Sequence, residues 1–358
     1  MDLKKPVTSH VLGMLVAMGC VAGPAMAHDN NRDRATLLVT STNNATANSI
    51  VVFKLGTTGA PSLSYVTSLT TGGAGGAGGN AGLVQFSDDL GVVANYGSNS
   101  VTQLVRYGDF INIGRAIGLA GGCMSPVSVA IGRDHLFAVG ANCVESHAWP
   151  SGRLDGSTVA LPDTSSAQVV IGQTWAAVTL KSGSVLQVPL NGAGALAGTS
   201  AKVALPAGAN DTPLGAAFWG NILGFNPAHS PDSLALVDSS RNVYPIAGPT
   251  PAFPNGNAPC WLAKGPGNLW YAGNTPAHAI SIFFSDGMGG AFYKSVPLPG
   301  APTDITVSPD GRWLAVIYSA ADGGHIGVFS IDAYGDLSPA GTSSPIGVAS
   351  FNGLAFSQ

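Results

Sequence analysis

The sequence predicts an all-β protein, a seven-bladed β-propeller whose first blade is closed by the C-terminal strand. Three observations lead to this fold. Short runs rich in β-branched and aromatic residues alternate with turns along the chain, which is typical of strands. The runs recur at a regular spacing. Only 9% of the residues are charged, and 49 Gly and 24 Pro disfavour helix interiors.

The clearest repeating unit lies near the C-terminus. Residues 303–307 and 313–318 are two apolar runs separated by the Ser-Pro-Asp-Gly stretch at 308–311. Pro presets φ, Asp bonds to its own backbone and Gly accepts a positive φ, so this stretch is typical of a tight turn. A third run, 325–330, follows after a short loop. The unit therefore predicts an antiparallel meander.

Six further segments resemble the first run of this unit. Successive starts, from residue 82 to residue 352, are 45, 40, 47, 46, 43 and 49 residues apart. A period of this length indicates a repeat architecture with one sheet in each repeat. A proline directly precedes four of the segments, which suits the start of a strand, where a missing N–H does least harm. The seven segments are 82–86, 127–131, 167–171, 214–218, 260–264, 303–307 and 352–356.

The two ends of the chain complete each other in this arrangement. Residues 36–69 contain three predicted strands but no first strand, whereas 352–356 is a first strand with nothing after it. We therefore expect the C-terminal strand to close the first blade, so that 28–358 forms a single domain of seven four-stranded sheets. Two β-sandwiches, the alternative fold, need a linker near the middle of the chain. The glycine-rich stretch 72–79 lies instead between the first two blades, and we expect a long surface loop there.

The first 27 residues differ from the rest of the chain. Two lysines give a basic start, residues 11–22 are apolar but too short to span a bilayer, and an Ala-Met-Ala stretch ends at Ala27. This pattern predicts a signal peptide cleaved after Ala27, which makes the mature protein secreted or periplasmic. Lipidation at Cys20 is the alternative. No other stretch is a candidate membrane span.

Charge and motifs exclude several classes of function. Residues 1–27 hold two of the 15 basic and one of the 19 acidic residues, so the mature chain has 13 basic and 18 acidic residues and a net charge of −5. Because it has no basic run, nucleic acid is not an expected partner. No Gly-x-Ser-x-Gly, Walker or dinucleotide motif is present, so serine-esterase and nucleotide-dependent chemistry have no local support. The expected partner is a small-molecule substrate or ligand, and we expect a monomer.

Several repeats resemble the β-propeller lactonase family, which includes 6-phosphogluconolactonase-like and carboxymuconate cyclase-like enzymes. The unit 303–341 carries the resemblance most clearly, and segments 95–101 and 258–261 are similar to the family's turns and strand starts. The resemblance spans about residues 36–358 and implies a propeller that acts on a small lactone or a muconate-type acid. The family's catalytic acid, base and arginines do not align with this chain, so no catalytic residue is carried over.

Four histidines gather in one class of predicted loop. In a propeller, the loops between second and third strands share a face with the connections into the first strands, around the mouth of the central channel. Imidazoles there suit general bases or metal ligands, and the one glutamate of the sequence, Glu145, suits an acid or base. Taken singly, each histidine is better explained as a surface or loop-packing side chain, and it is the gathering of four on one face that points to a site. The candidate catalytic residues are Glu145, His147, His229, His278 and His325.

A metal site and a disulfide are the remaining chemical candidates. No pair of these residues has the spacing of a local metal motif, so a divalent metal would have to be held by several blades. The expected chemistry requires no cofactor, with a divalent metal as the open alternative. Cys123 and Cys143 flank the first two strands of the third blade. In an exported protein we expect them to form a disulfide, with two buried thiols as the alternative.

Two functions of different classes fit these observations. The first is an exported lactonase-like hydrolase, or a lactonising isomerase, that acts at the channel mouth. The second is a non-catalytic propeller, at the cell surface or in the periplasm, that binds a ligand or a protein at the same place. The two differ in whether a lactone is turned over.

Overall fold

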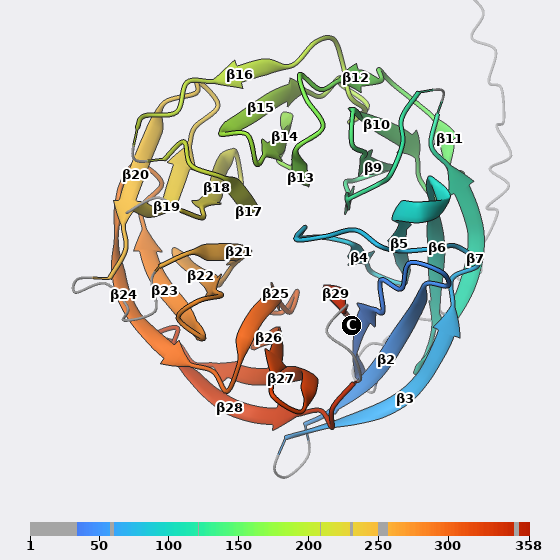
Figure 1. The fold of residues 1–358 in the computed structure, drawn as a ribbon, viewed down its shortest axis with the longest axis vertical. Helices are drawn as coiled ribbons and strands as arrows, with labels where there is room; N and C mark the ends of the chain where they lie inside the picture. The colour runs from blue at the N-terminus through green and yellow to red at the C-terminus, as the bar shows by residue number, and fades with distance from the viewer. Residues whose placement is uncertain are drawn as a thin grey trace, which may run out of the picture. The chain divides into compact units, whose positions relative to one another are not determined.

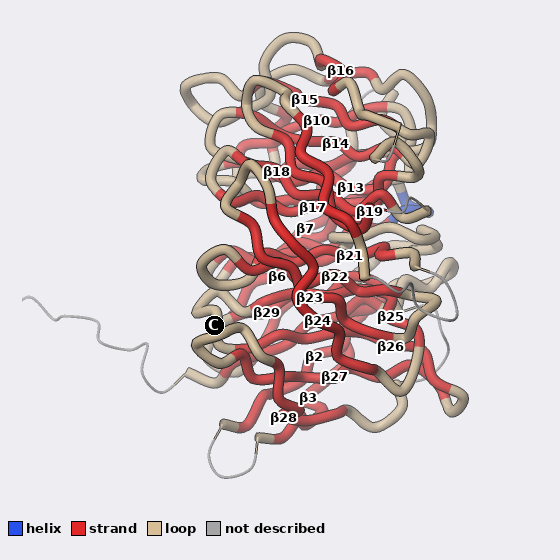
Figure 2. Tube along the Cα trace, turned by 90° about the vertical axis from the view of Figure 1, so that its left-hand side faces the viewer, coloured by secondary structure: helices blue, strands red, loops and turns tan. Residues whose placement is uncertain are grey.

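The computed structural model describes residues 34–57, 61–120, 122–207, 209–229, 232–249, 257–346 and 351–358. The predicted signal peptide lies outside these residues. Residues 35–358 belong to one structural unit. Its described elements are strands, apart from the 3-10 turn η1 (Tyr96–Ser98), and strands fill this unit in Figure 2. Among the described residues, no helix has the length and apolar character that a membrane crossing requires.

Seven antiparallel sheets stand around a central channel, as Figure 1 shows. The first strand of each sheet lies nearest the channel and the last lies at the rim. Six sheets have four strands, and the third has five because two short strands pair with the same neighbour. The prediction of a seven-bladed β-propeller is therefore confirmed.

The first three blades include the seam of the ring and the irregular blade. From channel to rim, blade 1 contains β29 (Asn352–Ser357), β1 (Thr36–Ser41), β2 (Ser49–Gly56) and β3 (Ser62–Thr70). Blade 2 contains β4 (Val84–Ser87), β5 (Leu90–Asn95), β6 (Ser100–Tyr107) and β7 (Phe110–Gly118). Blade 3 contains β8 (Ser128–Ile131), β9 (His135–Val139), β10 (Cys143–Ala148), β11 (Arg153–Leu154) and β12 (Val159–Ala160).

The other four blades follow the same order from channel to rim. Blade 4 contains β13 (Ser166–Ile171), β14 (Trp175–Leu180), β15 (Ser184–Pro189) and β16 (Ala201–Val203). Blade 5 contains β17 (Pro213–Trp219), β18 (Ile222–Pro227), β19 (Asp232–Val237) and β20 (Val243–Ala247). Blade 6 contains β21 (Pro259–Lys264), β22 (Leu269–Asn274), β23 (Ala279–Ser285) and β24 (Gly290–Pro297). Blade 7 contains β25 (Ala301–Val307), β26 (Trp313–Ala320), β27 (Gly323–Ile331) and β28 (Leu337–Thr342).

The C-terminal strand closes the ring, as the sequence predicts. β29 pairs antiparallel with β1, with Phe356 opposite Leu38 and Leu354 opposite Thr40. The Thr40 hydroxyl also donates to the Gly353 carbonyl at 2.8 Å, although the two residues are 313 positions apart in the chain. Pairing across the seam leaves no open inner edge in blade 1.

Apolar side chains pack between neighbouring blades. The second and third strands are apolar on both faces because each sheet is covered by a sheet on either side, and all six residues of β14 are buried. At the seam, Trp313 and Ile317 of blade 7 belong to one cluster with Leu38 and Phe53 of blade 1. Burying apolar surface between blades is the main stabilising contribution. Because the apolar core lies between the blades, the fold does not need apolar side chains in the channel, and polar side chains can line it.

The second-to-third-strand loops and the connections into the first strands gather at one end of the channel, which we call the mouth. Several first strands carry a β-bulge near this end. A bulge leaves one residue unpaired and turns its side chain in a new direction. The register shifts lie between Ser166 and Gln168, Pro213 and Ala216, Pro259 and Trp261, and Pro302 and Asp304.

Candidate functional site

A cavity of about 650 Å³ lies at the mouth, and we call it the mouth cavity. Its lining combines aromatic rings, side-chain amides, hydroxyls and the backbone of a glycine-rich segment. None of the described residues that line it carries a charge. Such a lining suits a neutral polar ligand. The residues are Asn43, Asn44, Ala45, Thr46, Gly76, Ala77, Gly78, Gly79, Trp261, Thr303, Phe351 and Asn352.

The glycine-rich segment, residues 72–82, differs from the expected surface loop because Asn43 holds it against blade 1. The Asn43 Oδ1 accepts hydrogen bonds from the backbone N–H groups of Gly76 at 2.8 Å and Ala77 at 3.0 Å. A Cβ atom at Gly75 would lie 2.5 Å from the carbonyl carbon of Asn43. Glycine is therefore required for this close approach.

The same segment crosses the mouth to reach blades 4 and 6. Lys181, in the turn after β14, donates from Nζ to the Gly78 carbonyl at 3.1 Å. Ala81 packs in one apolar cluster with Trp261 of β21. The segment thus forms part of the mouth cavity wall and also narrows the way into the channel.

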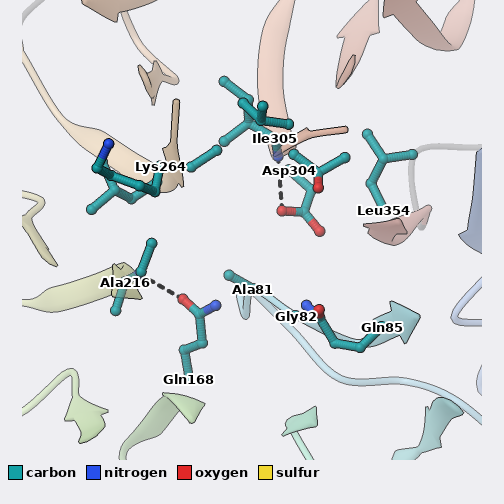
Figure 3. A pocket seen from close by; sticks show the side chains of 14 residues that line it. Ala81, Gly82, Gln85, Gln168, Ala216, Lys264, Asp304, Ile305 and Leu354 are labelled. Atoms are coloured by element: carbon teal, nitrogen blue, oxygen red, sulfur yellow. Dashed lines mark hydrogen bonds between the residues drawn. The ribbon is translucent and has the colours of Figure 1, made fainter. Parts of the chain in front are cut away.

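A second cavity, of about 210 Å³, lies in the channel between the first strands, and we call it the channel cavity. Figure 3 shows Ala81 and Gly82 between Gln168 on one side and Asp304 on the other. The Gln168 Oε1 accepts a hydrogen bond from the Ala216 N–H at 2.6 Å. The two cavities adjoin at the bulge of β25, because Thr303 lines the mouth cavity and Asp304 lines the channel cavity.

Thr303 and Asp304 each keep a buried oxygen without a partner. The Asp304 Oδ1 accepts a hydrogen bond from the Ile305 N–H at 2.8 Å. The Asp304 Oδ2 and the Thr303 Oγ1 have no hydrogen-bond partner among the described residues. Burial raises the pKa of Asp304 to about 7, against the opposing effect of the backbone N–H groups of Ile305, Gly353 and Leu354. A carboxyl group with this pKa can accept and release a proton near neutral pH.

Lys264 also lines the channel cavity, at the end of β21 away from the mouth. Its Nζ donates to the carbonyls of Gly265 at 2.7 Å and Gly267 at 2.6 Å. Burial lowers the pKa of Lys264 to about 8. The ammonium group is therefore held by backbone oxygens, and no ion pair joins Asp304 to a described cation.

Comparison with known proteins gives matches in structure but not in sequence. No protein-family model matches the chain, and no curated protein matches it significantly. A proposed 6-phosphogluconolactonase from Bacteroides uniformis is 14% identical, with a TM-score of 0.68 over 91% of this chain and 100% of that chain. The periplasmic gluconolactonase of Pseudomonas aeruginosa is 16% identical, with a TM-score of 0.65 over 90% of this chain and 99% of that one.

The chain has the fold of these propeller proteins. A catalytically inactive virginiamycin B lyase from Staphylococcus aureus, solved with quinupristin, has a TM-score of 0.54 at 13% identity, over 80% of this chain and 92% of that chain. Proteins named as lactonases and a lyase thus share the architecture. The fold implied by the sequence resemblance is confirmed, and the function has to be argued from the site.

Glu145 and His147 lie together, but inside β10 rather than in the loop predicted for them. The turn before β10 is short, so the strand starts at Cys143 and draws both residues into the sheet. The His147 Nε2 is 2.6 Å from the Glu145 Oε1, and both side chains are buried. The Ala120 N–H donates to both carboxylate oxygens, and the Gly152 carbonyl lies 3.1 Å from the His147 Nδ1. The pair is therefore supplied with hydrogen bonds from the protein itself.

The predicted disulfide between Cys123 and Cys143 is present. It ties the connection before β8 to the start of β10, next to Glu145. The donor atoms of the two cysteines and Glu145 lie within 4.8 Å of one another, which is the spacing of a metal cluster. Because both sulfur atoms are engaged in the disulfide, this group does not fit a divalent metal.

The other three predicted histidines lie apart from the two cavities. His229 and His278 are exposed in the turns after β18 and β22. His325, also predicted in a loop, lies in β27 because the turn before it ends at Asp322. Its Nε2 is 2.9 Å from the Asp322 Oδ1, and its ring stacks on Tyr318.

None of the five predicted catalytic residues is among the described residues that line the mouth or channel cavity. Their catalytic role remains a prediction. The sequence reasoning missed Thr303 and Asp304, which do line these cavities. One signal was present: Asp304 is the only acidic residue in the seven segments that recur as first strands.

Proposed function

We propose that the protein is an exported lactonase-like hydrolase, or a lactonising isomerase, that binds a small lactone in the mouth cavity. The observation that carries this proposal is the pair of unpartnered oxygens on Thr303 and Asp304, where the mouth cavity adjoins the channel cavity. Buried polar groups in proteins are nearly always hydrogen-bonded, so exceptions call for an explanation. Contact with a bound substrate supplies one.

The chemistry assigns one role to each oxygen. The Asp304 carboxylate takes a proton from water while the water oxygen bonds to the lactone carbonyl carbon. The Thr303 hydroxyl donates to the carbonyl oxygen as negative charge develops there. The ring C–O bond then breaks, the leaving oxygen takes the proton from Asp304, and the product is the open hydroxy acid. The reverse of this sequence closes a hydroxy acid to the lactone and releases water. A lactonising isomerase would instead join a carboxylate oxygen to a C=C carbon of the acid while protonated Asp304 gives its proton to the neighbouring carbon.

The uncharged lining favours a neutral lactone over a muconate-type acid. A dicarboxylate would need cationic side chains, and the described residues around the mouth cavity supply none. Trp261 and Phe351 provide apolar faces for a ring, while Asn44, Thr46 and Asn352 provide polar groups for its substituents. In this proposal the protein acts as a monomer without a cofactor.

Three observations support export. The Cys123–Cys143 disulfide is typical of proteins that work in an oxidising compartment. The N-terminal 27 residues have the pattern of a signal peptide. A structurally similar protein, the gluconolactonase of Pseudomonas aeruginosa, is named as periplasmic.

A direct test follows the acid released when a lactone ring opens. The purified protein, without residues 1–27, is mixed at constant pH with glucono-δ-lactone, γ-butyrolactone and a muconolactone. Base uptake is compared with the spontaneous rate. We expect saturable acceleration with the neutral lactones and less with the acidic one. Acceleration with none of the three would overturn the proposal.

A non-catalytic binding propeller is the second candidate. The observation in its favour is that the described mouth cavity lining has no charged group of its own. In that case the same lactones would bind saturably, as measured by calorimetry, but would not be consumed. Binding without turnover would therefore decide for this function.

A further inference from the structure

A third cavity, of about 370 Å³, lies at the seam where blade 1 meets blade 7, and we call it the seam cavity. It is bounded by β2 and β3 on one side and by residues 344–346, which follow β28, on the other. The side chains that shape it are Val51, Phe53, Leu63, Tyr65, Ile346 and Phe351.

The seam cavity is apolar within and open at its rim. Val51 and Phe53 are buried, whereas Tyr65 is 63% exposed. The Tyr65 ring stands edge-on to Phe53, with 6.1 Å between the ring centroids. No described residue that lines this cavity is charged. A space of this kind favours an aliphatic chain, because each methylene that leaves water contributes to binding.

Phe351 lines both the seam cavity and the mouth cavity. This side chain is nearly buried, and it directly precedes β29 at the mouth. Phe351 is thus shared by the walls of the mouth cavity, which has a mixed polar and apolar lining, and of the apolar seam cavity. A ligand that fills both has to carry a polar head and an apolar tail joined at this point.

We propose that the substrate is a lactone with an aliphatic side chain, whose ring occupies the mouth cavity and whose chain passes Phe351 into the seam cavity. This inference rests on the proposed lactonase function and specifies its substrate class. The ring presents its carbonyl to Thr303 and Asp304. The chain supplies binding energy away from the reacting bond, which can be used to orient the ring.

The experiment compares lactones that differ only in chain length. Turnover of γ-butyrolactone, γ-octalactone and γ-dodecalactone is measured at constant pH, and binding is measured by calorimetry with the Asp304→Asn protein. We expect kcat/KM to rise by up to about fourfold for each methylene that is buried. Alcohols with the same chains test whether the chain alone is recognised.

A variant that fills the seam cavity identifies where the chain binds. Ile346→Trp adds volume at a partly buried position of the cavity wall. It should lower the ratio of kcat/KM for γ-dodecalactone to that for γ-butyrolactone by at least tenfold. Tyr107→Ala, at an exposed position on the rim of blade 2, is the matched control and should leave the ratio unchanged.

Each outcome decides one of the two proposals. Turnover without any dependence on chain length overturns this inference but leaves the lactonase function standing. Binding that depends on chain length and on Ile346→Trp, without turnover, supports the seam cavity site and overturns the lactonase function. Alcohols that bind as tightly as the lactones overturn the role of the ring, and failure of every lactone to bind or react overturns both proposals.

Discussion

Among the residues whose burial the structure describes, two acidic side chains are buried, Glu145 and Asp304, and their surroundings differ. Glu145 in blade 3 is fully buried and receives hydrogen bonds from the Ala120 N–H and from His147. Asp304 in blade 7 is 4% exposed, and its Oδ1 accepts a hydrogen bond from the Ile305 N–H. The Gly353 and Leu354 N–H groups also favour its charged form, but its Oδ2, beside a cavity, has no hydrogen-bond partner among the described residues. Both carboxyl groups are nearly fully buried, but only Asp304 has an oxygen that can still accept a hydrogen bond from a ligand.

The comparison shows that burial and rarity are poor guides to a functional acid. Glu145 is the only glutamate of the sequence, yet its hydrogen bonds are complete within blade 3 and the neighbouring connection. Such a closed pair is typical of a structural role. Asp304 bears the burial penalty without equivalent compensation, which is the pattern found at active sites.

The largest effect is expected from Asp304→Asn. Removing a general base lowers the rate by about 10²-fold to 10⁴-fold. In the unmodified protein, kcat/KM should rise with pH through the Asp304 pKa of about 7 and level off above it, because the base acts when deprotonated. Steady-state kinetics on the preferred lactone measure the rate loss in the variant and the pH dependence of kcat/KM in the unmodified protein. Asp286→Asn, at an exposed turn in blade 6, is the control. Equal activity of the two variants would remove Asp304 from the mechanism.

The same Asp304→Asn substitution should stabilise the fold at alkaline pH. The folded-state pKa of about 7 lies above the ordinary value of 3.8, so folding favours the protonated form and stability falls as pH rises from about 4 to about 7. Since one pKa unit corresponds to about 1.36 kcal/mol, the charged form loses about 4 kcal/mol above pH 7. Urea unfolding at pH 5 and at pH 8 measures the difference between variant and parent. If Asp304→Asn is no more stable than the parent protein at pH 8, the charged form of Asp304 does not destabilise the fold.

Glu145→Gln is expected to act mainly on stability. Removing one partner of a buried hydrogen bond costs about 1 to 3 kcal/mol, because the other group is left buried without its partner. Urea unfolding gives the free energy, and a double-mutant cycle with His147→Gln isolates the pair. We expect the loss of stability to exceed the loss of turnover per folded molecule. A variant with normal stability and little turnover would instead support the catalytic role predicted for Glu145 and His147.

The smallest effect concerns a second acid–histidine pair, Asp322 and His325, in which Asp322 is exposed to solvent. Burial lowers the pKa of His325, but Asp322 and the Ser343 carbonyl more than offset this, and the pKa is raised. The resulting stabilisation is fully present below the ordinary histidine pKa of about 6.5 and is lost as pH rises through the raised value. Thermal unfolding across this range should show the loss in the parent and not in His325→Gln. The same pH dependence in both proteins would exclude the pair as its source.

Much of the fold could be predicted because local turn chemistry and the repeat agree. At 308–311 the Ser308 hydroxyl donates to Asp310 and accepts from the Trp313 N–H, while Gly311 has a φ of +72°. These are short-range contacts, and the residue types alone specify them. Closure by β29 also followed from the sequence, because counting strands leaves one unpaired at each end.

The site could be predicted only in part, because it depends on small shifts in register. The bulge between Pro302 and Asp304 decides which side chain of β25 lines which cavity. The residue types at these positions do not predict a bulge. The glycine-rich segment runs inward because its backbone N–H groups bond to Asn43, about 30 positions earlier in the chain. This contact forms only when the blades are assembled into the ring, so the local sequence does not predict it. By contrast, the disulfide was predictable because Cys123 and Cys143 flank adjacent strands of one blade.

Closure by β29 has a further consequence for the order of assembly. This strand follows every other strand in the chain, yet it is the innermost strand of blade 1. It places Leu354 in the channel lining, and its Gly353 and Leu354 N–H groups favour the charged form of Asp304. A nascent chain with six folded blades would still lack these groups. The surroundings that set the pKa of Asp304 are therefore complete only when β29 has joined blade 1.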